Sequence, residues 1–427
     1  MSLHESNLLK VERPVCATFG VAWFSYEHRH SFERVFLYFR YAIIANRTKE
    51  GIDMENTASS LVSVIVPVCN VQDFLDQCLN SIRNQTHENM EIICLNDGSQ
   101  DGSLDIMRQH AAEDERMVVI DKENEGYGAT CNRGMDMAKG EYVSIVEPDD
   151  FLLPAMYEDM LTLEHSFRQP IDIVKTPWID VSYWDDPEKE TFSPSTLYRR
   201  LKTSVKPFRL EEAPVLIETH PSIWSALYRR DFLNEKNIRF VPYPGAGWAD
   251  NPFLIETLCQ AETIAYLDKP YYNYRVDLPG STRNHKTDDA IARPFDRWIE
   301  MLKVLDRLNV SDLGILRAHY LRGFNYIAGA IYDDGWDNEL VRKKTQEVFA
   351  LMDKDIVLGH PKLHPQRKRF YLEQTDQPVT HISRLPYFAH LAKETLHETK
   401  AAGFTSTVRR IARHNPSKDP VETRNSE

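Results

Sequence analysis

Three acidic clusters follow or interrupt apolar segments of the chain, where carboxylates could bind a cation or accept a proton. Asp97 follows one apolar stretch, Glu147-Pro-Asp-Asp150 follows another, and Asp250 lies within Gly247-Trp-Ala-Asp-Asn-Pro252. Carboxylates gathered at one place disfavour one another's charge unless a positive charge neutralises them. A hard divalent cation, shared with diphosphate oxygens, would do this. The structural alternative is that Asp150 or Asp250 caps a helix N-terminus, where Asp is favoured.

The segments around these residues alternate between strand and helix patterns. Runs rich in β-branched residues at 62–68, 90–95, 117–120 and 142–146 predict buried strands, and 126–138 predicts a helix. Strands that alternate with helices indicate βαβ units and a parallel sheet. Ligands bind outside the carboxyl ends of the strands of such a sheet. We therefore expect Asp97 and the 147–150 cluster at one edge.

The second half of the chain has a looser pattern. It predicts a strand at 171–174, a helix at 251–259 and a strand at 263–267, while the polar, aperiodic stretch 180–215 predicts a long excursion. From Pro294 to about Met352 apolar residues recur at helical spacing. The predicted parts are an N-terminal extension of unknown role (1–60), an α/β domain (61–290), a helical region (291–360) and a basic tail (361–427).

Charge is unevenly distributed along the 427 residues. The chain has a net charge of −13, which argues against a nucleic-acid partner. Residues 361–427 nevertheless carry 12 Lys and Arg against 7 Asp and Glu. This tail suggests the hypothesis of a peripheral contact with an anionic membrane face, with a solvated tail as the alternative.

The six cysteines form no CxxC pair, no apolar run is long enough to span a bilayer, and the first residues lack the apolar core of a signal peptide. We therefore expect a cytoplasmic protein, with the inner face of the membrane as its hypothetical docking place.

The order of the motifs resembles glycosyltransferase family 2, which has the GT-A fold. The matching segments are Val64-Ile-Val-Pro-Val-Cys-Asn70, Asn96-Asp-Gly-Ser99, 124–134, 138–142, Glu147-Pro-Asp-Asp150 at the DxD position, 223–233, Asp250 at the place of the base, and Tyr272-Asn-Tyr-Arg275. The resemblance implies an α/β fold of GT-A type, with a mostly parallel sheet sandwiched by helices and a C-terminal helical region after it. Three positions depart from the family pattern: Glu147 begins the DxD-like motif, Cys131 stands where many members have Arg, and Ala249 precedes the base.

The resemblance implies a metal-dependent inverting enzyme that moves one sugar from a nucleotide-sugar to a hydroxyl of a glycan, lipid-linked or protein-linked acceptor, in surface polysaccharide or glycoconjugate synthesis. Asp250 would be the catalytic base, and Asp97 would accept from uracil N3–H, which favours UDP-sugars. Asp149, with Glu147 or Asp150, would hold Mn²⁺ or Mg²⁺. The implied donor-binding residues are Pro67, Val68, Asn70, Asp97, Gly98, Ser99, Asn124, Gly126, Glu147, Pro148 and Asp149. The acceptor-site candidates are His220, Trp224 and Trp248, whose rings suit sugar faces but equally suit ordinary packing.

Other classes of protein were weighed against this interpretation. A dinucleotide-dependent oxidoreductase needs G-x-G-x-x-G after the first strand, where this chain has Pro67-Val-Cys-Asn70. A processive synthase needs a membrane channel and a Gln-x-x-Arg-Trp motif, and neither is found. A sugar nucleotidyltransferase, which usually has a glycine-rich loop, and a non-catalytic nucleotide-sugar binding protein stay as alternatives.

Overall fold

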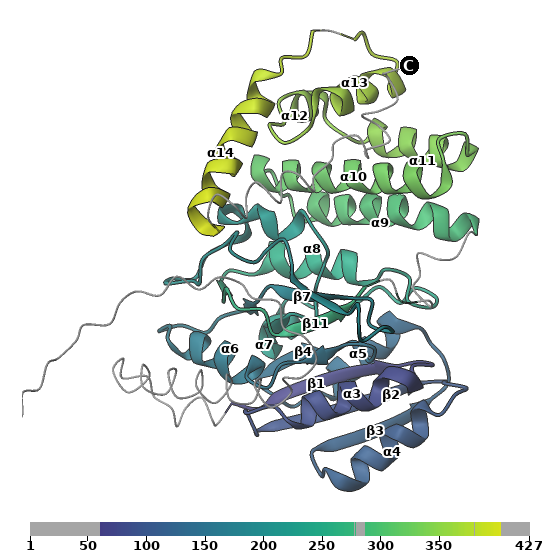
Figure 1. Cartoon of the computed structure of the whole chain (residues 1–427), viewed down its shortest axis with the longest axis vertical. Helices are drawn as coiled ribbons and strands as arrows, with labels where there is room; N and C mark the ends of the chain where they lie inside the picture. The colour runs from purple at the N-terminus through teal and green to yellow at the C-terminus, as the bar shows by residue number, and fades with distance from the viewer. Residues whose placement is uncertain (1–59, 277, 279–286, 380, 403–427) are drawn as a thin grey trace, which may run out of the picture. The chain divides into compact units, whose positions relative to one another are not determined.

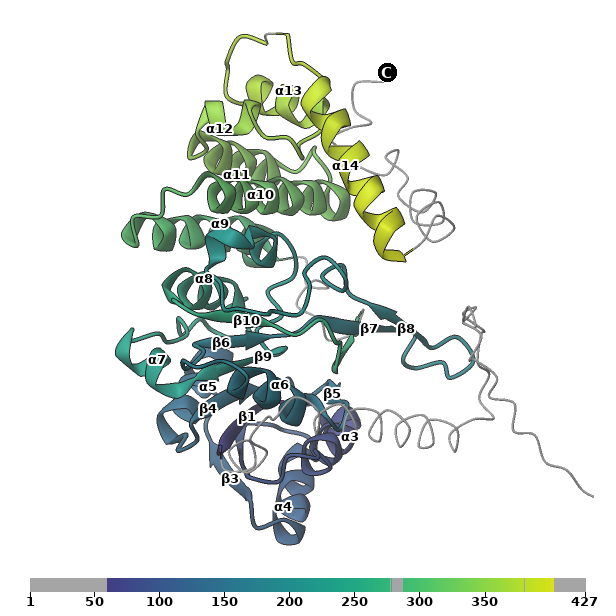
Figure 2. The same cartoon turned by 90° about the vertical axis from the view of Figure 1, so that its left-hand side faces the viewer.

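The computed structural model describes residues 60–276, 278, 287–379 and 381–402 (Figure 1). Residues 1–59 of the predicted N-terminal extension lie outside them. The described residues form an α/β domain that is followed by helices. Figures 1 and 2 both show helix α9 (Asp288–Arg307) lying between α8 (Asp250–Gln260) and α10 (Leu313–Asp334).

A seven-stranded sheet in the order β10-β6-β9-β4-β1-β2-β3 forms the centre of the α/β domain. Neighbouring strands among β1, β2, β3 and β4 are parallel to each other, and β10 is parallel to β6. Strand β9 is antiparallel to both of its neighbours, β4 and β6. The predicted, mostly parallel sheet is therefore confirmed. The strand bounds are β1 Val62–Val68, β2 Met90–Asp97, β3 Met117–Lys122, β4 Tyr142–Ile145, β6 Ile173–Lys175, β9 Ala226–Arg229 and β10 Ile264–Tyr266.

Register brings the ends of the first strands together. Val68 at the end of β1 pairs with Asn96 in β2, and Asn96 pairs with Asp121 in β3. All seven residues of β1 are buried, which explains why it reads as a continuous apolar run. The residues that follow β1 and β2 thus meet at one edge of the sheet.

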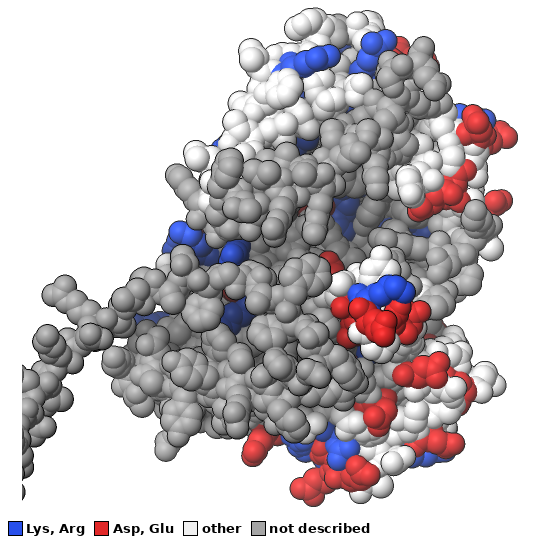
Figure 3. Space-filling model, in the orientation of Figure 1, with Lys and Arg blue, Asp and Glu red and all other residues white. Residues whose placement is uncertain are grey.

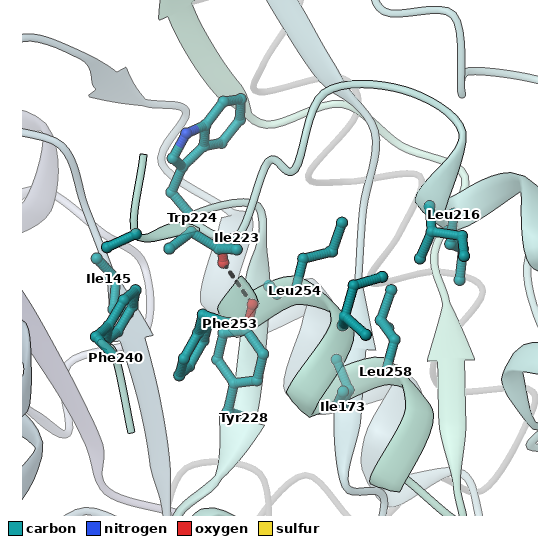
Figure 4. Close-up of a cluster of buried hydrophobic side chains, with 14 of the residues drawn as sticks. Ile145, Ile173, Leu216, Ile223, Trp224, Tyr228, Phe240, Phe253, Leu254 and Leu258 are labelled. Atoms are coloured by element: carbon teal, nitrogen blue, oxygen red, sulfur yellow. Dashed lines mark hydrogen bonds between the residues drawn. The ribbon is translucent and has the colours of Figure 1, made fainter. Parts of the chain in front are cut away.

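Helices cover the sheet. They are α3 (Gln72–Arg83), α4 (Ser103–Glu113), α5 (Tyr127–Met137), α6 (Met156–His165), α7 (Arg230–Glu235) and α8. Figure 4 shows Phe253, Leu254 and Leu258 of α8 beside Ile173 and Tyr228 of the sheet. Phe253 stacks on Phe240 with ring centroids 4.0 Å apart. This packing fixes the position of the N-terminus of α8, where Asp250 lies.

A second sheet of four strands has the order β5-β11-β7-β8, with β5 Phe151–Leu152, β7 Trp178–Ser182, β8 Thr191–Pro194 and β11 Tyr272–Arg275. The predicted excursion at 180–215 contains regular structure that the sequence pattern did not indicate. It includes most of β7, all of β8, the short 3₁₀ helix Leu210–Glu212 and the first residues of a second one, Pro214–Ile217. All four residues of β8 are exposed, so the strand lacks the apolar alternation by which strands are recognised.

The predicted helical region is confirmed. It consists of α9, α10 (Leu313–Asp334), α11 (Glu339–Ala350) and α12 (Lys354–Leu358). Two more helices, α13 (Pro365–Gln374) and α14 (Leu385–Ala402), lie within the basic segment 361–427, and α13 buries Phe370, Tyr371 and Leu372. Within the described residues, no helix is long and apolar enough to cross a bilayer.

The charged surface around β3 and α4 is of mixed sign, with Asp and Glu among Lys and Arg (Figure 3). Arg108 and Asp121, for example, lie 3.4 Å apart with more than half of each side chain exposed. Such exposed pairs are worth about 0–1 kcal/mol, so this surface contributes little to stability.

Candidate functional site

Asp97 ends β2 with a side chain that is only 5% exposed. The Lys122 ammonium group contacts its Oδ1, which also accepts from the Glu125 N–H at 2.8 Å, and Oδ2 accepts from the Gly126 N–H at 3.0 Å. Burial raises the pKa of Asp97, but Lys122 and the backbone N–H donors outweigh it and leave the pKa below its usual value. Asp97 is therefore an ionised acceptor held in one orientation.

Two glycines let the backbone close around Asp97. Gly98 has φ +70°, and a Cβ there would lie 2.9 Å from the Asn124 nitrogen. Gly126 has φ +88°, and a Cβ there would lie 2.6 Å from the Tyr243 oxygen. Side chains larger than hydrogen do not fit either position, and both φ values are disfavoured for L-residues. Asn124 donates from Nδ2 to the Asp97 carbonyl oxygen at 2.8 Å, which joins the two predicted donor-binding segments.

The end of β1 reaches the same place. Ser99 Oγ accepts from the Asn70 N–H at 3.1 Å, and Asn70 Oδ1 accepts from the Gln100 N–H at 2.7 Å. Pro67 and Val68 are opposite Leu95 and Asn96 in the sheet register. The structure therefore brings together all the predicted donor-binding residues from 67 to 126.

The acidic cluster after β4 is enclosed. Glu147 accepts from the Tyr127 hydroxyl at 2.6 Å, and its N–H donates to the Tyr272 hydroxyl at 3.0 Å. Burial, and next the charge of Asp149, raise the pKa of Glu147 to about 8. Burial also raises the pKa of Asp149 and, together with Asp149's charge, that of Asp150. Pro148, between Glu147 and Asp149, is buried.

Arg275 of β11 holds the loop that carries Asp149. Its guanidinium group donates to the Asp149 carbonyl oxygen and to Gln77, and lies over the rings of Phe74 and Phe151 at 5.1 and 4.9 Å. The Arg275 N–H donates to Asp150 Oδ1 at 2.8 Å. The second sheet therefore binds the Asp149 carbonyl oxygen and the Asp150 carboxylate, which gives the acidic cluster a rigid support.

The cluster has the donor chemistry of a site for a hard cation. Glu147, Asp149 and Asp150 offer only carboxylate oxygens, which Mg²⁺ and Mn²⁺ prefer. Asp150 Oδ2 is buried without a hydrogen-bond partner in the described structure. In the part of the chain that the structure describes, no three His, Cys, Asp or Glu side chains are grouped as a complete metal site. A cation here would therefore need further ligands, such as diphosphate oxygens.

Asp250 is the first residue of α8, and Ala249 occupies the N-cap position without a side-chain cap. The structure therefore does not place Asp250 at the cap. Burial raises the pKa of Asp250 to about 6, while the charge of Arg322 and a hydrogen bond from Asn251 lower it. Asn251 Nδ2 donates to Asp250 Oδ1 at 3.1 Å. At neutral pH this carboxyl group is mostly ionised and could accept a proton.

The three acidic clusters meet around the first turns of α5. Burial is the largest cause of the raised pKa of the Cys131 thiol, and the charges of Glu147, Asp97 and Asp250 add to it. Burial likewise raises the pKa of the Tyr127 hydroxyl group, and the charges of Glu147 and Asp250 add to this shift. Carboxylates from three distant parts of the sequence therefore surround one helix end.

The structure brings His220 and Trp224 together in one aromatic cluster, with ring centroids 5.7 Å apart, whereas Trp248 lies elsewhere. Trp224 is 3% exposed and stacks on Tyr272 at 4.0 Å, so it is part of the core, beside Ile223 in Figure 4. His220 is half-buried, 5.0 Å from the ring of Tyr274. Trp248 is half-buried and 5.7 Å from the ring of Tyr326 in α10, two residues before Asp250.

Sequence reasoning missed four residues that support the carboxylates: Lys122 at Asp97, Tyr127 at Glu147, and Asn251 and Arg322 at Asp250. Tyr127 had a signal, since it follows Asn124-Glu-Gly126 directly. Arg322 had none, because it lies in a helix about 70 residues further along the chain.

Comparisons with known proteins show which proteins the chain is similar to. Residues 63–235 match the model of the family "Glycosyl transferase family 2". The chain is 32% identical over 223 residues to the uncharacterized glycosyltransferase EpsJ of Bacillus subtilis, which covers 50% of this chain and 61% of EpsJ. It is 42% identical over 256 residues to a poly(ribitol-phosphate) beta-glucosyltransferase of Bacillus spizizenii, covering 59% of this chain and 37% of that protein. The chain thus spans less than two thirds of these relatives.

The fold is also that of a solved structure. Residues 1–349 of S. aureus TarS, solved in complex with UDP-GlcNAc, align with a TM-score of 0.59 at 17% identity, covering 80% of this chain and 92% of that one. This likeness confirms the GT-A type of fold. Residues 63–235 are thus similar to glycosyltransferase family 2, and the fold of the chain is similar to that of TarS.

Proposed function

We propose that the protein is a metal-dependent, inverting glycosyltransferase. It moves one sugar from a nucleotide-sugar, most simply a UDP-sugar, to a hydroxyl group of a glycan, lipid-linked or protein-linked acceptor in the synthesis of a surface polymer. The single observation that carries the proposal is the meeting of Asp97, Glu147 and Asp250 around the first turns of α5. These are the groups that must read the nucleotide, hold the diphosphate and take the proton.

The donor is proposed to lie along the edge formed by Asn70, Asp97 and Asn124. Asp97 is ionised and already accepts from Lys122, Glu125 and Gly126. A carboxylate has about four lone-pair sites, so Asp97 can still accept one more hydrogen bond, such as that from uracil N3–H. Cytosine lacks that N–H, which is why a uridine donor is favoured.

The leaving group is proposed to face Asp149, with Glu147 or Asp150 as the second cation ligand. Bound Mn²⁺ or Mg²⁺ would offset the charge of the departing nucleoside diphosphate. The chain's own part is to place the carboxylates. Arg275 binds the Asp149 carbonyl oxygen and the Asp150 carboxylate, and the Tyr127 hydroxyl group donates to Glu147.

Asp250 is proposed to remove the proton from the acceptor hydroxyl group. The acceptor oxygen then forms a bond to the anomeric carbon while the bond from that carbon to the diphosphate oxygen breaks, and the leaving group keeps the electron pair. A single displacement of this kind inverts the anomeric configuration. His220 and Trp248 are the half-buried rings proposed to contact the acceptor, and Trp224 supports them from the core.

A membrane contact is the finer part of the proposal. Helix α14 leaves Leu385, Phe388, Leu391 and Leu396 exposed, and the basic residues after 402 lie outside the described residues. Exposed apolar side chains together with positive charge suit an anionic lipid surface. Flotation with phosphatidylglycerol vesicles should carry the full-length protein, and equal flotation of a protein shortened after residue 384 would contradict this contact.

The test of the function is a panel of UDP-, GDP- and dTDP-sugars with and without Mn²⁺, for the wild type and Asp250→Asn. UDP-GlcNAc is the first donor to try because TarS was solved with it. We expect one uridine donor to bind both proteins when the cation is present, and donor hydrolysis or transfer to be far slower with Asp250→Asn than with the wild type.

Other outcomes would decide for the alternatives. Binding without turnover in both proteins, across a set of glycan acceptors, would favour a non-catalytic binding protein. Release of pyrophosphate from a nucleoside triphosphate and a sugar phosphate would favour a nucleotidyltransferase. No binding of any nucleotide-sugar would contradict the proposal.

A further inference from the structure

Arg322 lies in α10 of the helical region, but its side chain binds residues of the α/β domain. Its side chain is 2% exposed, and its Nε donates to the Ile217 carbonyl oxygen at 2.9 Å. Nη2 donates to the Thr219 carbonyl oxygen, and Nη1 donates to Asn251 Oδ1 at 2.8 Å. All three acceptors belong to segments that flank the proposed acceptor site, because His220 follows Thr219 and Asp250 precedes Asn251.

These hydrogen bonds orient the side-chain amide of Asn251. Arg322 can only donate, so the Asn251 atom that it contacts must be the oxygen. The Tyr326 hydroxyl, one helical turn further on, donates to the same oxygen at 2.6 Å. The amide nitrogen of Asn251 is thereby turned toward Asp250 Oδ1, to which it donates at 3.1 Å. A continuous chain of hydrogen bonds thus runs from α10 to the carboxylate.

The buried positive charge of Arg322 is unusual for a residue that only holds two segments together. No carboxylate of the described residues lies within ion-pair distance of its guanidinium group, which is satisfied by carbonyl, amide and hydroxyl oxygens. Burying an unpaired charge is costly, and a neutral side chain could join two backbone segments without that cost. The ionisable group on which this charge acts at the site is Asp250.

We propose that Arg322 is a positioning residue for the transfer reaction: through Asn251 it fixes the orientation of Asp250, and through Ile217 and Thr219 it fixes the segment that carries His220. This inference rests on the proposed role of Asp250 as the base. It makes the helical region a part of the acceptor side of the site.

The charge of Asp250 in turn raises the pKa of Glu147, and of Tyr127 and Cys131 of α5. Among the described residues, Arg322 from α10 is the positive group whose charge lowers the pKa of Asp250. Its loss should therefore move the acid limb of the pH–rate profile to higher pH, whereas a loss of packing alone would leave that limb in place.

The experiment compares Arg322→Met, Arg322→Lys and Tyr326→Phe with Arg342→Met. Arg342 is a matched control, because it binds the carbonyl oxygens of Trp336 and Asp337 inside the helical region. Thermal melting gives the folded fraction, and calorimetry gives the donor Kd. We expect Arg322→Met to lower kcat about 100-fold through misplacement of the base, with little change in donor Kd. Its acid limb should move up in pH, while Arg322→Lys should keep the limb and recover part of kcat.

A double-mutant cycle with Asp250→Asn separates positioning from a general loss of structure. If Arg322 acts through Asp250, Arg322→Met should cost little further turnover in the Asp250→Asn background. Equal losses in both backgrounds, or a wild-type kcat and pH profile for Arg322→Met and Tyr326→Phe, would overturn the inference. An inactive wild type would instead overturn the proposed function. If Arg322→Met does not fold, Arg322→Lys and Tyr326→Phe still decide the matter, since both should lower kcat at unchanged donor Kd.

Discussion

The ionisation of Asp250 should set the acid limb of the pH dependence of kcat/KM. Burial raises the pKa of this carboxyl group to about 6. A general base works only when ionised, so activity should be lost as the pH falls through that value. Between about pH 7 and about pH 5 the ionised fraction falls from about 0.9 to about 0.1, so kcat/KM should drop about tenfold. Asp250→Asn should lower the rate about 10²–10⁴-fold at neutral pH and remove this acid limb.

The assay is the release of nucleoside diphosphate, measured across the pH range at limiting donor with the cation held constant. Asp268→Asn is the matched control. The pKa of Asp268 is also raised by burial, and its Oδ1 accepts from the Arg199 N–H at 2.9 Å, outside the acidic clusters. This variant should keep both the rate and the acid limb. A flat profile below neutral pH, or an Asp250→Asn protein with the wild-type rate and limb, would refute the assignment of the base.

Three further predictions concern the support of the site. Lys122→Met leaves the buried Asp97 with only backbone donors, and should lower the free energy of unfolding by about 2–3 kcal/mol and weaken donor binding. Gly126→Ala forces a residue with φ +88° and a Cβ 2.6 Å from the Tyr243 oxygen, and should cost about 1–3 kcal/mol and weaken donor binding. Phe253→Ala removes a 1% exposed ring below Asp250, and should cost about 3–5 kcal/mol. Urea unfolding and donor titration measure all three.

Each of these variants has a control. Lys206→Met removes a 75% exposed ammonium group 3.3 Å from Glu212 and should cost at most about 1 kcal/mol. Gly329→Ala adds a methyl group in α10 with no atom within 4 Å and should be neutral or slightly stabilising. Val205→Ala trims a 95% exposed side chain and should have no measurable effect. Losses in the controls as large as in the matched variants would contradict the explanation by burial.

The first half of the α/β domain could be predicted because local pattern and tertiary environment agree there. β1 is buried along its whole length, and β2 nearly so, so their apolar runs indicate central strands of a parallel sheet. Helix α9 was predictable for the same reason: its apolar residues lie on one face, with Phe295, Trp298 and Leu302 buried.

The second sheet was not predictable because the residue pattern of its strands does not determine which strands pair. β8 is exposed throughout, and β11 pairs with β7 although nearly 100 residues separate them in the sequence. β9 is antiparallel between parallel strands, and its Arg229 pairs with Asp172, so the segment reads as a mixture of aromatic and basic residues. Such pairings depend on the closed fold and leave no local signal.

For the candidate site, the sequence revealed the carboxylates but not the groups that hold them. Acidic residues at strand ends are recognisable by type and position. The ammonium group of Lys122 and the guanidinium group of Arg322 reach their partners across 25 and 71 residues. The sequence does not show which of its many basic residues lie near the carboxylates, because this depends on the packing of the folded chain.

Because Glu147 is buried and its pKa is raised, binding of the proposed donor should depend on pH. With a pKa of about 8, this carboxyl group holds a proton in the donor-free protein at neutral pH. Any positive charge that binds beside it favours the ionised form, so we expect the proton to leave when the proposed donor and its cation bind. The heat measured on donor binding should then vary with the ionisation enthalpy of the buffer that receives the proton.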